Sequence, residues 1–131
     1  MKRHLASFHR YGMIVLAWGL LVVLLTTLPG DLPVMRALFS VTRRIRFSDT
    51  IGHAALFGIS TALIWQLLHR WLRPHHALLL AMATVLAVGA STEVYQWYVA
   101  SRSASMSDML ANWLGVFIVG FVISYRQRDI Q

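Results

Sequence analysis

The stretch that decides the fold is YGMIVLAWGLLVVLLTTL, residues 11–28, which carries no charged side chain. A helix that crosses a bilayer needs about 20 mostly apolar residues, so this stretch predicts a transmembrane helix. Basic residues precede it, as in a signal peptide. However, the apolar run is too long for a typical signal-peptide core, and no small-residue cleavage pattern follows it. We therefore expect this first helix to be retained.

Three further apolar stretches follow, at residues 51–68, 77–100 and 109–125. Together with the first they predict an all-α integral membrane protein with four transmembrane helices in an antiparallel bundle, forming a single domain over residues 1–131. Residues 34–46 lie between the first two stretches and place apolar residues at helical spacing, with arginines on the opposite side. This pattern predicts a short amphipathic helix in the membrane interface after the first span.

Composition supports a membrane protein and excludes several kinds of site. The chain is 57% hydrophobic and 13% charged, whereas a soluble domain averages about 25% charged residues. It contains no cysteine, which excludes disulfides and thiolate chemistry. The formal net charge is +7, but the basic residues are dispersed along the chain. We therefore expect membrane lipids rather than nucleic acid as partners, and no cofactor.

The distribution of lysine and arginine weakly favours one orientation of the chain in the membrane. With both termini in the cytoplasm, seven of the twelve basic residues lie on the cytoplasmic side and five on the opposite side. This difference favours cytoplasmic termini in a multi-pass protein of the bacterial cytoplasmic membrane.

The few acidic residues predict a site. Three of the five, Asp49, Glu93 and Asp108, lie at the edges of the apolar stretches, each with a polar companion one helical turn away. Ionisable groups in or beside membrane spans are costly unless they are paired or solvated, so they indicate function. Four spans place all of these groups on one membrane face, whichever way the chain is inserted. The candidate ligand-binding residues on that face are Asp49, His53, Glu93, Gln96, Arg102, Asp108 and Asn112, with Arg43, Arg44 and Arg46 of the interfacial segment.

Small residues are expected to let neighbouring helices approach closely. In the second span these are Ala54, Gly58 and Ala62, and in the third span they are Ala83, Ala87 and Ser91.

The runs SDTIGHAALFG (48–58) and STEVYQWYVASRSASMSDMLANWLGVFIVG (91–120) resemble the VanZ-like family of small bacterial membrane proteins. The family pattern is an acid followed by His, then Glu-x-x-Gln, an Arg, and Asp-x-x-x-Asn-x-x-Gly. The matching positions are Asp49, His53, Glu93, Gln96, Arg102, Asp108, Asn112 and Gly115. Many relatives have Lys after the first acid, where this chain has Thr50. The resemblance implies a cell-envelope role associated with teicoplanin resistance, and it implies no particular reaction.

Three functions fit the predicted site. The first is binding of an amphiphilic envelope ligand, such as a lipid-linked precursor or a glycopeptide, because guanidinium groups match phosphate oxygens. The second is a membrane-embedded hydrolase or transferase in which Asp49 orients His53 as the acid/base and Glu93 supplies a second carboxylate. The third is an assembly subunit in which the site holds the helices together. The oligomeric state stays open.

Simpler roles also fit individual residues. Asp108 and Ser105 form a Ser-x-x-Asp capping box, and Asp49 could likewise cap its helix. Glu93 lies late in a helix, where the helix dipole disfavours an anion, so it requires a partner, for which Arg102 or His53 is suitable. A divalent ion on Asp49, His53, Glu93 and Asp108 is a weaker alternative, and we predict no metal site.

Overall fold

The computed structural model describes residues 2–28, 32–33, 36–37, 40, 48–98 and 105–128. Within them the chain forms four helices: α1 (Lys2–Thr27), α3 (Ser48–Leu68), α4 (Pro74–Tyr98) and α5 (Met106–Arg128). Each is long and apolar enough to cross a membrane, which indicates a multi-pass membrane protein and confirms the four predicted apolar helices. The predicted interfacial helix at 34–46 lies almost entirely outside the described residues.

The local sequence explains where the last two helices begin. Pro74 occupies the start of α4, where its missing N–H and fixed φ suit the first helical turn. The carbonyl of Ser105 accepts hydrogen bonds from the amides of Asp108 and Met109 at 3.0 and 3.1 Å, and these bonds start α5. Asp108 lies in the first turn of α5, where the helix dipole favours an anion.

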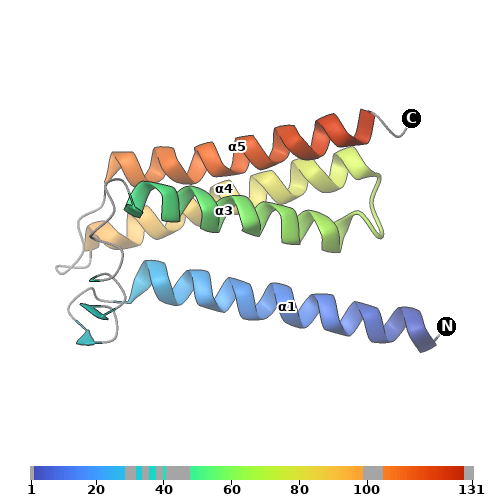
Figure 1. Cartoon of the computed structure of the whole chain (residues 1–131), viewed down its shortest axis with the longest axis horizontal. Coiled ribbons are helices and arrows are strands. Elements are labelled where there is room, and N and C mark those ends of the chain that lie inside the picture. Colours follow the sequence, from blue (N-terminus) through green and yellow to red (C-terminus); the bar gives the residue numbers. More distant parts are fainter. Residues whose placement is uncertain are drawn as a thin grey trace.

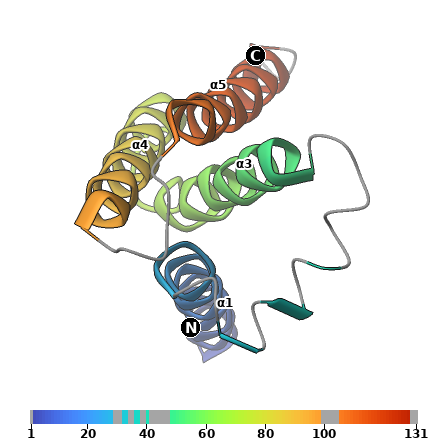
Figure 2. The ribbon, with the colours of Figure 1, turned by 90° about the vertical axis from the view of Figure 1, so that its left-hand side faces the viewer.

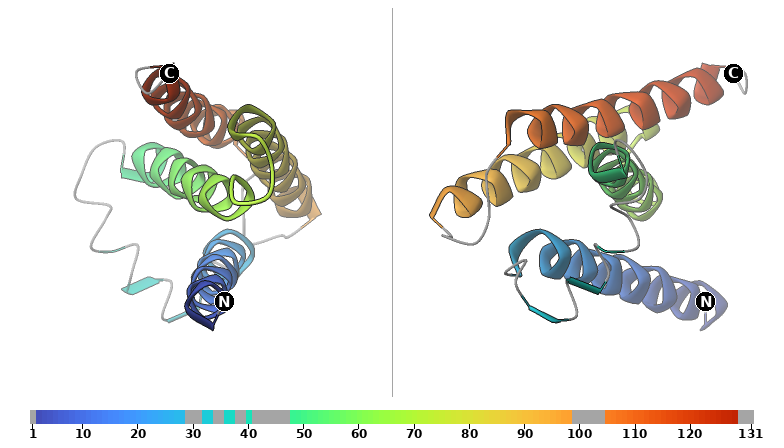
Figure 3. Two further views of the ribbon diagram at one scale, coloured as in Figure 1. Left: turned by 90° about the vertical axis from the view of Figure 1, so that its right-hand side faces the viewer. Right: turned by 60° about the vertical axis from the view of Figure 1, so that its left-hand side comes forward.

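The helix ends gather at two ends of the molecule (Figure 1). The start of α1 and the finish of α5 lie at one end. At the other, α1 and α4 finish while α3 and α5 begin; this end is called the polar end below. Helix α3 contacts each of the other three described helices. Helix α1 lies on the side of α3 away from α5 in every view (Figures 2 and 3).

Helices α3 and α5 approach each other almost backbone to backbone. A Cβ atom placed on Gly115 would lie 2.0 Å from the carbonyl oxygen of Ala54. One placed on Gly58 would lie 3.0 Å from Cγ2 of Val119 and 3.1 Å from the carbonyl oxygen of Gly115. Two of the predicted small residues of α3, Ala54 and Gly58, therefore do allow the close approach.

The prediction for α4 is wrong about which small residues pack. Ala83, Ala87 and Ser91 are all exposed. The buried stripe runs at four-residue spacing through Ala77, Ala81, Val85, Gly89 and Glu93. Residues two positions apart lie about 200° apart around a helix, so the predicted set, which is offset by two from the buried stripe, faces away from it. The rotation of α4 that packs Gly89 against the ring of Phe57 also carries Glu93 into the interior.

The core lies where α1, α3, α4 and α5 meet. Val22, Phe57, Val85 and Val116 form one buried cluster, one residue from each helix. Phe57 and Val116 are among the largest fully buried side chains. This cluster lies next to the polar end and forms the apolar base of the candidate site.

Candidate functional site

Each predicted site residue whose side chain the structure describes lies at the polar end. These residues are His53 on α3, Glu93 and Gln96 on α4, and Asp108 and Asn112 on α5. Asp49 lies in the first turn of α3, but its side chain is outside the described part of the structure. The predicted arginines Arg43, Arg44, Arg46 and Arg102 also lie outside the described residues.

A hydrogen bond between His53 and Asn112 joins α3 to α5. His53 Nδ1 lies 2.9 Å from Asn112 Oδ1. An amide oxygen only accepts, so Nδ1 is the donor of this hydrogen bond, and the tautomer with its hydrogen on Nδ1 has Nε2 as an acceptor or base. The pair forms because His53 precedes Ala54 and Asn112 lies one turn before Gly115, where the two backbones meet. Asn112 thus supplies an orienting contact for His53 that the sequence did not predict, while the predicted contact with Asp49 involves a side chain outside the described part of the structure.

Asn112 also brings an unused donor into the interior. Its side chain is only 1% exposed. Among the described residues, its Nδ2 has no hydrogen-bond partner. A buried amide without a partner is costly, so this donor is available to a ligand or to water at little further cost.

Glu93 is the most unusual group of the site. It is 7% exposed, although it is a carboxylate near the end of a helix. Its Oε2 accepts a long hydrogen bond, 3.4 Å, from the backbone amide of Ser105. Asp108 and His53 are near enough to act on it electrostatically, while its Oε1 is buried without a hydrogen-bond partner in the described structure. A capping box would give the Ser105 amide to Asp108; here it goes to Glu93.

Gln96 connects α4 to α1. Its Nε2 donates to the carbonyl oxygen of Thr26 at 2.7 Å, and both residues are buried. The last carbonyls of a helix lack intrahelical partners, so Gln96 caps the end of α1. Sequence reasoning missed Thr26, because its acceptor is a backbone atom with no signature of its own. The one available signal was a glutamine within an apolar run, one turn after Glu93.

Replacing Gln96 with leucine is expected to loosen α1 at the polar end. The buried carbonyl of Thr26 would lose its donor, and interhelical hydrogen bonds in membrane proteins contribute about 0.5–2 kcal/mol. The free energy of unfolding should fall by about that amount, measured by denaturation in mild detergent. Protease cleavage on the C-terminal side of α1 should be faster than in the wild-type protein. Ser91→Ala is the matched control, because the exposed Ser91 hydroxyl donates within its own helix, to the carbonyl of Ala87, and has no other partner among the described residues. Equal stability of the two variants would contradict the capping role.

Among the described residues, these contacts leave three groups that can serve a ligand: an acceptor at Glu93 Oε1, a donor at Asn112 Nδ2, and the second ring nitrogen of His53. Mixed donors and acceptors of this kind suit hydroxyl, amine or amide groups. A metal centre has no support within the described ranges, where no group of three His, Cys, Asp or Glu residues could hold an ion.

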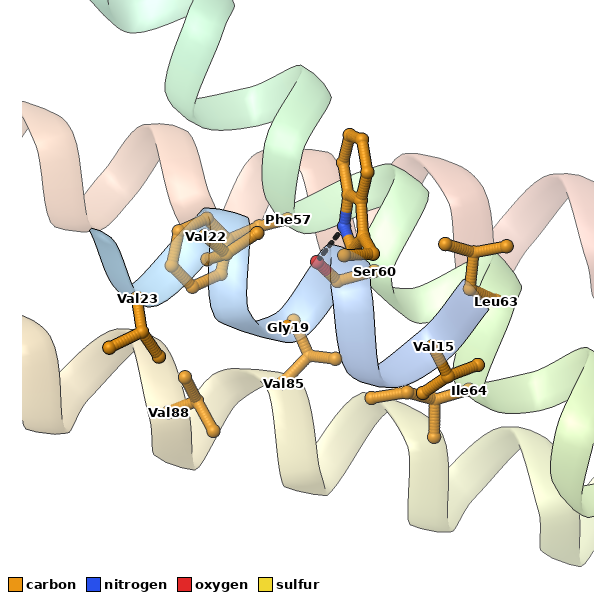
Figure 4. A pocket seen from close by; sticks show the side chains of 11 residues that line it. Val15, Gly19, Val22, Val23, Phe57, Ser60, Leu63, Ile64, Val85 and Val88 are labelled. Atoms are coloured by element: carbon orange, nitrogen blue, oxygen red, sulfur yellow. Dashed lines mark hydrogen bonds between the residues drawn. The ribbon is translucent and has the colours of Figure 1, made fainter. Parts of the chain in front are cut away.

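An apolar groove, shown in Figure 4, lies near these polar groups, because its lining residue Phe57 is one helical turn after His53 on α3. It has a volume of about 210 Å³ and lies between α1, α3 and α4. Its walls are almost wholly apolar. Trp18 Nε1 donates to Ser60 Oγ at 2.9 Å, and Ser60 Oγ donates in turn to the carbonyl oxygen of Leu56 at 2.7 Å. The sequence did not predict the groove, since the apolar residues of α1 look alike on its packed and exposed faces.

Comparisons with protein-family models, with curated proteins and with solved structures found no match to this chain. The VanZ-like resemblance therefore rests on the spacing of the motif residues alone.

Proposed function

We propose that this chain is an envelope membrane protein that binds the polar headgroup of an amphiphilic ligand at the polar end. The observation that carries this proposal is the pair of buried groups at the polar end that have no partner in the described structure, Glu93 Oε1 and Asn112 Nδ2; a third such group, Gln127 Nε2, lies near the far end of α5. Leaving such groups unmatched costs several kcal/mol in an apolar setting. A headgroup that offers a donor to the carboxylate and an acceptor to the amide removes that cost.

The proposed placement follows the sequence. The four helices cross the bacterial cytoplasmic membrane as an antiparallel bundle with both termini in the cytoplasm, and the polar end lies at the outer face. Arg102, with Arg43, Arg44 or Arg46, then supplies positive charge for a phosphate beside the buried acceptor and donor. The ligand class is a lipid-linked or phosphate-bearing envelope molecule. The VanZ-like family that the chain resembles is associated with reduced teicoplanin susceptibility, and binding of this ligand would lower susceptibility to glycopeptides.

Lipid co-purification with Asn112→Asp tests the proposal. This substitution keeps an oxygen facing His53 Nδ1 but removes the Nδ2 donor. We expect wild-type protein to carry a phosphate- or sugar-bearing lipid enriched over the bulk membrane, identified by mass spectrometry. Losing the single donor should reduce retention of that lipid about tenfold per folded protein, the effect of roughly 1.4 kcal/mol. Ser91→Ala serves as control. A wild-type lipid complement that mirrors the bulk membrane would contradict headgroup binding.

A membrane-embedded hydrolase or transferase is the second candidate. It is favoured by the His53 tautomer, in which Nδ1 is held by Asn112 and Nε2 is left as the base. Incubation of the purified protein with lipid-linked cell-wall precursors would then yield a product detectable by mass spectrometry. Saturable binding without product favours recognition. If Asn112→Asp lowers stability without any change in bound lipid, a structural role is favoured instead, in which the polar groups hold the helices together.

A further inference from the structure

We infer that the groove between α1, α3 and α4 holds one hydrocarbon chain of the amphiphile whose headgroup lies at the polar end. This inference rests on the proposed function and adds the class of the ligand: a lipid with a chain that lies against α1. The position, the chemistry and the size of the groove support this occupant.

The groove lies within about one helical turn of the site on three helices. On α1, Val22 of the groove lies one turn before Thr26, whose carbonyl accepts from Gln96. On α3, Phe57 of the groove lies one turn after His53. On α4, Val88 lies just over one turn before Glu93. One turn rises about 5.4 Å, so a headgroup at the polar groups leaves its chain at the mouth of the groove.

The walls favour a chain over any polar occupant. Trp18 Nε1 donates to Ser60 Oγ, and Ser60 Oγ donates to the carbonyl oxygen of Leu56, so these groups require no partner from an occupant. Water is disfavoured in such a space, and an apolar cavity of about 150 Å³ already stays dry and binds benzene. At about 210 Å³ this groove is larger than that. It lies between helices that each qualify as a membrane span, so hydrocarbon chains surround it.

A hydrocarbon chain gains little free energy by moving from the bilayer into the groove, because lipid tails are as apolar as the groove. The groove therefore does not select the ligand by hydrophobicity. Its effect is to hold the chain in one place, while the polar end selects the headgroup. The appropriate measurement is chain mobility rather than affinity alone.

Gly19 allows the groove to be filled without disturbing the protein. It lines the groove, and a Cβ atom placed there would meet nothing within 4 Å. Gly12 lies two turns earlier on the same helix, also has open space at its Cβ, and is not among the groove-lining residues. Gly19→Phe and Gly12→Phe are thus a matched pair, one of which occupies the groove.

The test uses phosphatidylglycerol with a nitroxide on one acyl chain, present in phosphatidylcholine vesicles that contain the purified protein. Phosphatidylglycerol offers a phosphate and hydroxyl groups, and chain-labelled phosphatidylcholine is the comparison. Electron paramagnetic resonance measures the immobilised fraction of the label. We expect wild type and Gly12→Phe to immobilise the phosphatidylglycerol chain, and Gly19→Phe to lose that component with unchanged thermal unfolding.

Each outcome decides one of the two proposals. If Gly19→Phe keeps the immobilised component, the groove is not the chain site; headgroup binding still stands if phosphatidylglycerol is preferred and Glu93→Gln removes the preference. If Gly19→Phe loses the component but both lipids behave alike in wild type, the chain site stands and headgroup recognition fails. Cross-linking of two copies through position 19 in the same vesicles would overturn the inference, because a second chain would then fill the groove.

Discussion

Replacing Gly115 with alanine is expected to cost more than about 3 kcal/mol, above the usual range for an overpacked core. A Cβ atom there would lie 2.0 Å from the carbonyl oxygen of Ala54, 2.7 Å from its carbonyl carbon and 2.9 Å from its Cα. All three are backbone atoms, so no change of the side chain at position 54 can make room. Helices α3 and α5 would have to separate. Denaturation in mild detergent and membrane abundance measure the loss.

Two other glycines serve as controls. Gly120→Ala places a Cβ 2.7 Å from Met82 Sδ, the far part of a flexible side chain that can move aside. Gly52→Ala, on α3, meets nothing within 4 Å. Alanine is favoured over glycine in a helix by about 1 kcal/mol, so both controls should stay near or above wild-type stability. Gly115→Ala with wild-type stability would show that the helices do not approach as described.

Gly115→Ala should also open the candidate site. Gly115 lies one turn after Asn112, and Ala54 follows His53 directly. Separating the two backbones lengthens the His53–Asn112 hydrogen bond, which is 2.9 Å in the intact protein. Any Gly115 variant that still reaches the membrane should therefore lose lipid retention together with stability.

The four spans could be predicted because an uninterrupted apolar run has few alternatives at that length. The helix ends were harder to place. Helix α5 begins at Met106, whereas the apolar run suggested 109, because Ser105 and the polar residues after it start the helix before its apolar part. The order of the spans predicts that the polar groups gather at one end of the bundle. The predicted site residues whose side chains are described do lie at that end.

The partners within the site could not be predicted, because they depend on how each helix is rotated. The spacing on one helix predicted only Asp49 as a partner of His53, whereas the close approach at Gly115 also brings Asn112 to His53 from another helix. Small residues at four-residue spacing occur on two sides of α4, and only the packing of Gly89 against Phe57 decides between them. The contact between Gln96 and the Thr26 carbonyl has no residue pattern at all.

Replacing Glu93 with glutamine is expected to weaken ligand retention about 10- to 100-fold, the range for losing a hydrogen bond to a charged group. Glutamine has nearly the same shape and can still accept from the Ser105 amide through its oxygen. It removes the charge and replaces one acceptor with a donor, so a ligand donor facing Oε1 would meet another donor. Retained lipid, measured by mass spectrometry per folded protein, gives the effect, with Ser91→Ala as control.

The direction of the stability change in Glu93→Gln distinguishes a ligand-binding site from a polar cluster that only holds the helices together. A carboxylate that is 7% exposed, with one oxygen lacking a partner in the described structure, is costly in the empty protein. If Glu93 is kept for a ligand, Glu93→Gln should unfold at an equal or higher temperature while retention falls, as expected of a group selected for function. If Glu93 holds the helices together, the same change should lower stability and leave the lipid complement unchanged. In cells, the binding role predicts greater teicoplanin susceptibility at normal membrane abundance. Wild-type susceptibility and wild-type lipid retention at that abundance would refute any role of Glu93 in recognition.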